Sequence, residues 1–271
     1  MTILDRNNVQ VLGSTGPVLL YGHGFGCSQD MWRRVTPAFA ASHRQILFDY
    51  VGSGKSDLSA FDPTRYSRLQ GYVDDLLEVC DALDLHSDVS FVGHSVSCNI
   101  GLLASIQRPA LFDSLVLVGP SPCTLNHPPD YFGGFEREDM DDLLALMDHN
   151  YIGWAQQLAG AASGEPPSGA LSGELSDSFC STDPVMARVF AQTAFMSDIR
   201  AKLPRVTRPC MIVQHRQDAL APLSVGDYLH AQLRGSALAV LDLIGHCAHM
   251  SHPQLVIAAM RAHLQGRASQ H

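Results

Sequence analysis

The segment Gly93-His94-Ser95-Val96-Ser97 places a serine between an apolar run and a stretch with helical spacing. A sharp strand-to-helix turn strains such a serine and presents its hydroxyl above the sheet, as in a nucleophile elbow. The residues two positions away must be small, because the chain nearly folds back on itself. Gly93 meets this requirement, and Ser97 stands where a second glycine is usual. We therefore predict that Ser95 is a catalytic nucleophile.

A serine hydroxyl needs a base that takes its proton, and the base needs an orienting acid. In this arrangement the chain order is serine, acid, histidine. Asp218 follows an apolar run that ends near Val213, which puts it at the carboxyl edge of the predicted sheet. Asp242, within a predicted strand, and Asp227, on a predicted helix, are poorer candidates. Asp218 is therefore the predicted acid.

Three histidines follow the last predicted strand. His246 comes directly after that strand and a glycine, which suits a loop that reaches back to Ser95. His249 lies about one turn further on, where it would line the loop or cap the final helix, and His252 belongs to that helix start. Their spacing also fits a zinc site, but no carboxylate or cysteine set completes one. We predict His246 as the base and no metal.

Acyl transfer also needs donors for the oxyanion that develops on the carbonyl oxygen. The backbone N–H of Val96 is one candidate, and that of Phe25, in the loop His23-Gly24-Phe25-Gly26, is the other. A plain glycine-rich turn is the alternative interpretation of this loop. His94 precedes the nucleophile, and we interpret it as a packed neighbour at the substrate pocket rather than a proton carrier.

Short continuous apolar runs alternate with helical stretches over most of the chain. Such a pattern predicts a mostly parallel sheet covered by helices on both faces. The alternation of apolar runs and helical stretches is absent between residues 121 and 203. Helical spacing dominates there, and Asp183-Pro184 is a typical helix start. We predict a core of residues 1–120 and 204–271, with about four inserted helices at 121–203. The predicted strands are 18–21, 46–48, 89–92, 115–118, 210–213 and 238–243.

The composition excludes several function classes. The 271 residues carry a net charge of −9 and show no basic stripe, which argues against nucleic acid and anionic membranes as partners. No apolar run has the length of a membrane helix and no signal peptide is visible. The seven cysteines are scattered, so we expect reduced thiols and a cytoplasmic protein. The turn 52–57 lacks the full phosphate-loop spacing, and we interpret it as structural.

The sequence resembles the RsbQ-type hydrolases, a group that includes a bacterial stress regulator and the plant strigolactone and karrikin receptors. The similarity covers nearly the whole chain, and the Ser97 of the elbow matches the plant receptors. The segments that carry it are His23-Gly24-Phe25-Gly26, Phe48 to Gly54, Gly93-His94-Ser95-Val96, Gly119 to Cys123, Gly133 to Glu136, Asn150-Tyr151 and Gly245-His246.

This resemblance implies an α/β-hydrolase fold with a four-helix lid over a hydrophobic pocket. It implies a triad at Ser95, Asp218 and His246, and so favours His246 over His249. By position, Phe25, Phe135, Trp154 and Phe195 resemble pocket wall residues, although packing within the lid is the alternative for each aromatic ring.

We expect a serine hydrolase that cleaves a small hydrophobic ester, lactone or enol ether without a cofactor. The main alternative is a sensor that binds and slowly cleaves a small molecule, with a regulatory protein partner at the lid surface. A cofactor-free lyase or C–C hydrolase is a further alternative on the same triad. A haloalkane dehalogenase would need an aspartate in place of Ser95.

Overall fold

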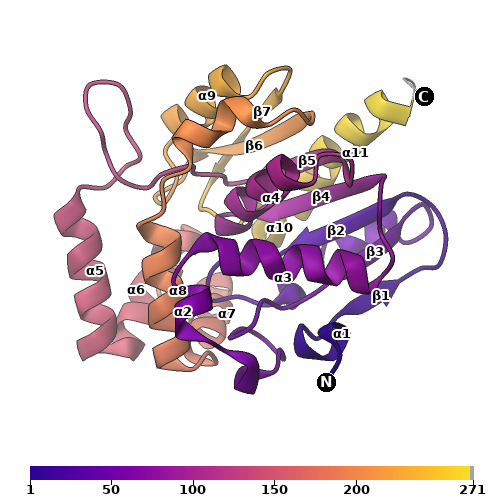
Figure 1. Cartoon of the computed structure of the whole chain (residues 1–271). Helices are drawn as coiled ribbons and strands as arrows, with labels where there is room; N and C mark the ends of the chain where they lie inside the picture. The colour runs from indigo at the N-terminus through magenta and orange to yellow at the C-terminus, as the bar shows by residue number, and fades with distance from the viewer. Residues whose placement is uncertain (269–271) are drawn as a thin grey trace.

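The centre of the fold is a seven-stranded sheet with the strand order β1-β3-β2-β4-β5-β6-β7 (Figure 1). The computed structural model describes residues 1–268. Neighbouring strands are parallel except β1 and β3, which are antiparallel. The predicted mostly parallel sheet is confirmed. The strands are β1 Gln10–Leu12, β2 Val18–Gly22, β3 Arg44–Leu47, β4 Val89–His94, β5 Phe112–Val118, β6 Cys210–Gln217 and β7 Ala237–Ile244.

The central strands β4 and β5 are buried along almost their whole length. Such burial is typical of parallel strands covered on both faces, and it explains why these segments stand out as unbroken apolar runs. The edge strand β1 is exposed at every position. It has only three residues, Gln10-Val11-Leu12, which are too few to show an alternating pattern, and the sequence analysis did not predict it.

Helices cover both faces of the sheet. α3 (Leu69–Ala82) packs against α4 (Val96–Gln107), which also contacts β2, β4 and β5. α9 (Leu223–Gln232) packs on β6 and β7, and α10 (Ala248–Ser251) and α11 (Pro253–Ala268) lie behind the sheet in Figure 1. The short helices α1 (Ile3–Arg6) and α2 (Pro63–Tyr66) complete the core. Within residues 1–268, no helix has both the length and the apolar character needed to span a membrane.

Four helices, which we call the helical insertion, lie between β5 and β6: α5 Arg137–His149, α6 Tyr151–Ser163, α7 Ala170–Cys180 and α8 Pro184–Phe195. They stand together beside the sheet in Figure 1. α8 begins where the sequence predicts: the Asp183 side chain accepts hydrogen bonds from two backbone N–H groups, and Pro184 occupies the first turn.

The insertion covers the carboxyl ends of the strands. The rings of Phe179, on α7, and Phe195, on α8, contact the ring of Phe25, which follows β2. The loops after β2, β4, β6 and β7 therefore meet under the inserted helices, where the predicted catalytic residues lie.

Candidate active site

Ser95 occupies a strained turn between β4 and α4. Its φ of 55° and ψ of −123° lie in a region that L-residues rarely adopt. A Cβ added to Gly93 would lie 2.9 Å from the backbone of Ser97, so the chain does fold back on itself. The Ser95 N–H donates to Val118 O at 2.9 Å and ties the turn to β5. This geometry is the one expected of a nucleophile elbow.

Ser97 replaces the usual glycine without breaking the turn, because its hydroxyl is used. It donates to the backbone oxygen of His23, and the hydroxyl of Tyr50 lies 2.9 Å away. The nucleophile turn is thereby fastened to the glycine-rich loop after β2, which carries Phe25.

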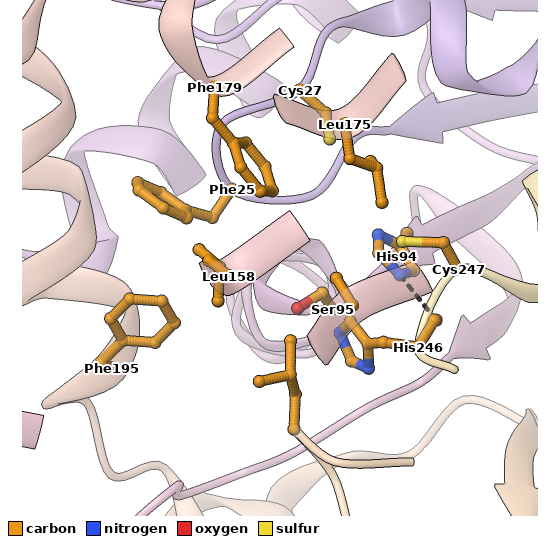
Figure 2. A pocket seen from close by; sticks show the side chains of 12 residues that line it. Phe25, Cys27, His94, Ser95, Leu158, Leu175, Phe179, Phe195, His246 and Cys247 are labelled. Atoms are coloured by element: carbon orange, nitrogen blue, oxygen red, sulfur yellow. Dashed lines mark hydrogen bonds between the residues drawn. The ribbon is translucent and has the colours of Figure 1, made fainter. Parts of the chain in front are cut away.

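His246 and Asp218 form a buried pair. Asp218 follows β6, His246 follows β7, and His246 Nδ1 lies 2.7 Å from Asp218 Oδ2. The other carboxylate oxygen, Oδ1, accepts the backbone N–H groups of Leu220 and Ala221 at 2.8 and 3.1 Å. His246 Nε2 is buried and has no hydrogen-bond partner among the described residues. Figure 2 shows this imidazole beside Ser95, so Nε2 is the nitrogen available to take a proton.

The Asp218 carboxyl stays ionised despite its burial. Burial alone would raise its pKa, but the neighbouring His246 and contacts from the imidazoles of His215 and His246 outweigh this effect. The net pKa of Asp218 lies well below its usual range. The side chain therefore carries the negative charge that orients His246 and stabilises its cation.

The rival histidines and carboxylates lie elsewhere. His249 is fully buried on α10, where its ring lies 4.6 Å from that of Trp32 and 4.4 Å from that of His94. His252 is exposed at the end of α10. Asp242 is exposed in an ion pair with Arg216, and Asp227 is exposed on α9.

The two predicted oxyanion donors lie on either side of Ser95. Val96 is the first residue of α4, where helix N–H groups have no acceptor within the helix. Phe25 lies in the loop after β2 and lines the same cavity as Ser95 and Val96. His94 packs behind the nucleophile, with Nε2 3.1 Å from the backbone oxygen of His246.

The cavity above Ser95 has two lobes that share Phe25, Ser95, Phe195, Leu220 and His246. Apolar and sulfur-containing side chains dominate the first lobe, and the second also contains Asn99, Ser121 and Thr124. Neither lobe is lined by a charged lysine, arginine, aspartate or glutamate among the described residues. The first lobe adds Cys27, His94, Leu158, Ala162, Leu175, Phe179 and Cys247.

The four aromatic residues predicted for the pocket do not all line it in the structure. Phe25 and Phe195 line both lobes. Trp154 is fully buried behind the wall, with its ring 5.9 Å from that of Phe25. The assignment of Phe135 to this pocket is not supported. Phe135 instead lines a separate depression with α5 residues, because it bridges to Leu125 in the segment that precedes α5.

The turn 52–57 is structural. The Asp49 carboxylate accepts N–H groups from Gln29, Lys55 and Asn8 at 2.8 to 2.9 Å. A Cβ at Gly54 would lie 2.5 Å from that carboxylate, so the turn is wrapped around Asp49 and not around a ligand.

Potential metal ligands gather away from the three C-terminal histidines. Among the described residues, ligand atoms of Cys123, His127 and Asp198 lie within 4.8 Å of one another. The Asp198 carboxylate is held there by Arg200 at 2.6 Å. His246 is paired with Asp218, His249 is packed against Trp32, and His252 is exposed. These three positions do not fit a shared metal ion.

Sequence reasoning missed one residue of the site. His215, on β6, is fully buried with Nδ1 3.4 Å from Asp218 Oδ2. It lies within a strand, where a lone histidine carries no motif. Only its three-residue separation from Asp218, across the end of the strand, could have drawn attention to it.

Known proteins resemble this chain in sequence and in fold. The sequence profile described as "Alpha/beta hydrolase family" matches residues 18–259. The chain is 40% identical to a probable esterase of Oryza sativa subsp. japonica and 37% identical to "Karrikin insensitive 2 receptor CA" of Petunia hybrida, with 96% of each chain covered. A solved hydrolase from Oleispira antarctica matches with a TM-score of 0.93 and 43% identity, over 97% of this chain and 96% of the other.

We predict that Gly93→Ala destabilises the protein by about 2 kcal/mol or more, because its Cβ meets Ser97 backbone and the Phe91 ring. Gly173→Ala is the matched control. No atom lies within 4 Å of a Cβ at that helical position, so its alanine should be neutral or slightly stabilising. Urea unfolding monitored by circular dichroism measures both. Equal midpoints for the two variants would contradict the close approach.

The stability of the fold should fall with acidity. Burial, and then the neighbouring histidines, hold the pKa values of His94 and His249 well below the usual value. Both rings therefore stay neutral when folded but bind protons when unfolded below about pH 6.5. Each ring can therefore lower the free energy of unfolding by up to about 1.4 kcal/mol for every pH unit below about pH 6.5.

His249→Gln should reduce that slope by the contribution of one proton. Denaturant unfolding between pH 7 and pH 5 gives the two slopes. Parallel curves for wild type and variant would show that His249 is not neutral in the folded state.

Proposed function

The chain belongs to the alpha/beta hydrolase family, in the RsbQ-like group of its strigolactone and karrikin relatives, and from this we propose a specific activity. It is a serine hydrolase that cleaves small hydrophobic esters, lactones or enol ethers through Ser95, His246 and Asp218. One observation carries this proposal. A strained serine and a histidine with a free, buried Nε2 line one apolar cavity, and a buried carboxylate holds the other nitrogen of that histidine.

The reaction follows from these positions. His246 Nε2 takes the proton of Ser95 as its oxygen attacks the carbonyl carbon, and Asp218 stabilises the imidazolium. The N–H groups of Phe25 and Val96 bind the oxyanion. His246 then gives its proton to the leaving oxygen, which leaves an acyl group on Ser95. Water, deprotonated by His246, releases the acid and restores the serine.

The cavity supports a small, uncharged substrate. Its two lobes offer mostly apolar walls and no lysine, arginine, aspartate or glutamate side chain among the described residues. The polar groups of the second lobe, from Asn99, Ser121 and Thr124, can hold the more polar half of an ester. In this proposal residues 121–203 act as a lid over a core formed by 1–120 and 204–271.

A small-molecule sensor is the second candidate, and the 37% identity to a karrikin receptor favours it. In this candidate the same triad cleaves its ligand slowly, and the lid surface binds a regulatory protein. Exposed apolar residues of the insertion, Ile152 on α6 and Val185 on α8, support such a contact.

We predict that Ser95→Ala lowers the turnover of a p-nitrophenyl acyl ester by at least about 10³-fold without unfolding the protein. The exposed Ser59→Ala is the matched control and should be fully active. Stopped-flow absorbance at the nitrophenolate band measures both. An unchanged rate in Ser95→Ala would refute the nucleophile.

The same time course separates the two candidates. A burst of nitrophenolate followed by rapid turnover supports a metabolic hydrolase. A burst followed by almost no turnover supports the sensor.

Replacement of the base should discriminate between neighbouring histidines. His246→Ala is expected to lower kcat by about 10³-fold or more, because no other described group takes the Ser95 proton. His249→Ala should change kcat by less than about tenfold and act mainly on stability, since it removes a buried ring. Steady-state kinetics well below the melting temperature of each variant gives the ranking, and the opposite ranking would assign the base to His249.

A further inference from the structure

Two imidazoles face the same oxygen of Asp218. His246 Nδ1 lies 2.7 Å from Oδ2, and His215 Nδ1 lies 3.4 Å from it. The side chains of His215 and Asp218 are both fully buried. Because a carboxylate only accepts hydrogen bonds, each imidazole that binds it must present an N–H.

The other carboxylate oxygen, Oδ1, is not free to bind either imidazole. Oδ1 already accepts the backbone N–H groups of Leu220 and Ala221. Both imidazole nitrogens therefore approach Oδ2, the oxygen that these backbone N–H groups leave free. This oxygen is also the one that must stabilise the cation formed on His246 during the reaction.

Packing alone does not account for a histidine at position 215. A buried imidazole without a polar partner destabilises a fold, and an aliphatic side chain would fill the space without that cost. Neither nitrogen of His215 has a hydrogen bond of ordinary geometry among the described residues. Its contact with Asp218 is the electrostatic interaction that compensates for burial.

We propose that His215 is a positioning residue that sets the acidic limit of the hydrolysis proposed above, because it directs an N–H of Nδ1, from 3.4 Å, at the Asp218 oxygen that holds His246. An N–H directed at Oδ2 weakens this oxygen as an acceptor for the imidazolium that forms during the reaction, so the acidic limb of the reaction begins at a lower pH. This inference rests on the proposed function for its kinetic test.

The surroundings leave Asp218 as the charged group of this cluster. His94 on β4 and His249 on α10 are buried and neutral, since burial and then their histidine neighbours keep their pKa values low. Burial also raises the pKa of the Cys247 thiol. On the elements packed nearby, the charged side chains of Arg216, Asp242, Asp227 and Arg261 lie on the exposed surface.

The test is the pH profile of kcat/KM for Ser95-dependent ester cleavage. In His215→Leu the acidic limb should move up by about one pH unit, with the plateau changed less than about threefold. His215→Asn can donate an N–H from the same place and should return the limb to the wild-type position. The matched control is His249→Leu, at an equally buried neighbour that does not bind Asp218, and its limb should not move.

A readout without turnover keeps this inference separate from the proposed function. The ¹⁵N shift of His215 Nδ1 in the wild-type protein should be that of a protonated nitrogen, and the His246 Nδ1 proton should move downfield in His215→Leu. If wild type shows no Ser95-dependent cleavage, the proposed function fails while these NMR signals still decide the role of His215. The inference would be overturned if His215 Nδ1 is unprotonated in the wild type. It would also be overturned if His215→Leu shifts neither the acidic limb of the pH profile nor the His246 Nδ1 proton signal.

Discussion

The chain reversal at Ser95 is the constraint on which the rest of the site depends. It requires β4 to end and α4 to begin within one residue, so the helix must lie very close to the sheet. The ring of Phe91 fills the space, and a Cβ at Gly93 or Gly101 would come within 2.7 or 2.3 Å of it. The strained backbone of Ser95 persists because this packing leaves it no alternative.

A single buried negative charge organises the electrostatics around that serine. The imidazoles of His246 and His215 lie 2.7 and 3.4 Å from Asp218 Oδ2, and the two carboxylate oxygens have different partners. Oδ1 is anchored by backbone N–H groups, and Oδ2 faces imidazoles. Burial keeps the pKa values of His94 and His249 low and both rings uncharged, so they do not compete with His246 for the carboxylate. A positive charge can then develop on His246 when the nucleophile is deprotonated.

The sequence could predict the elements and residues that obey strong local rules. The buried strands appear as apolar runs, and Ser95 and Asp183 lie in turns and caps that few other residues tolerate. The exposed β1 carries no such signal. His215 and the packing of His249 against Trp32 depend on contacts between distant segments, which one sequence does not encode locally. For Phe135 the sequence suggested too much. Its position in the chain resembles that of a pocket residue in the related proteins, but its ring lines a separate depression.

The helical insertion touches both loops that the chemistry needs. The backbone N–H of His246 donates to Ala162 O on α6 at 2.7 Å, and Ser178 on α7 donates to Gly26 O at 2.8 Å beside Phe25. A shift of α6 would therefore disturb the loop that carries His246, and a shift of α7 would disturb the loop that carries Phe25. Catalytic geometry and the position of the insertion are thus linked by direct hydrogen bonds. This linkage would serve a hydrolase, in which both loops must hold their positions during the reaction, and equally a sensor, in which the state of Ser95 must reach the outer surface.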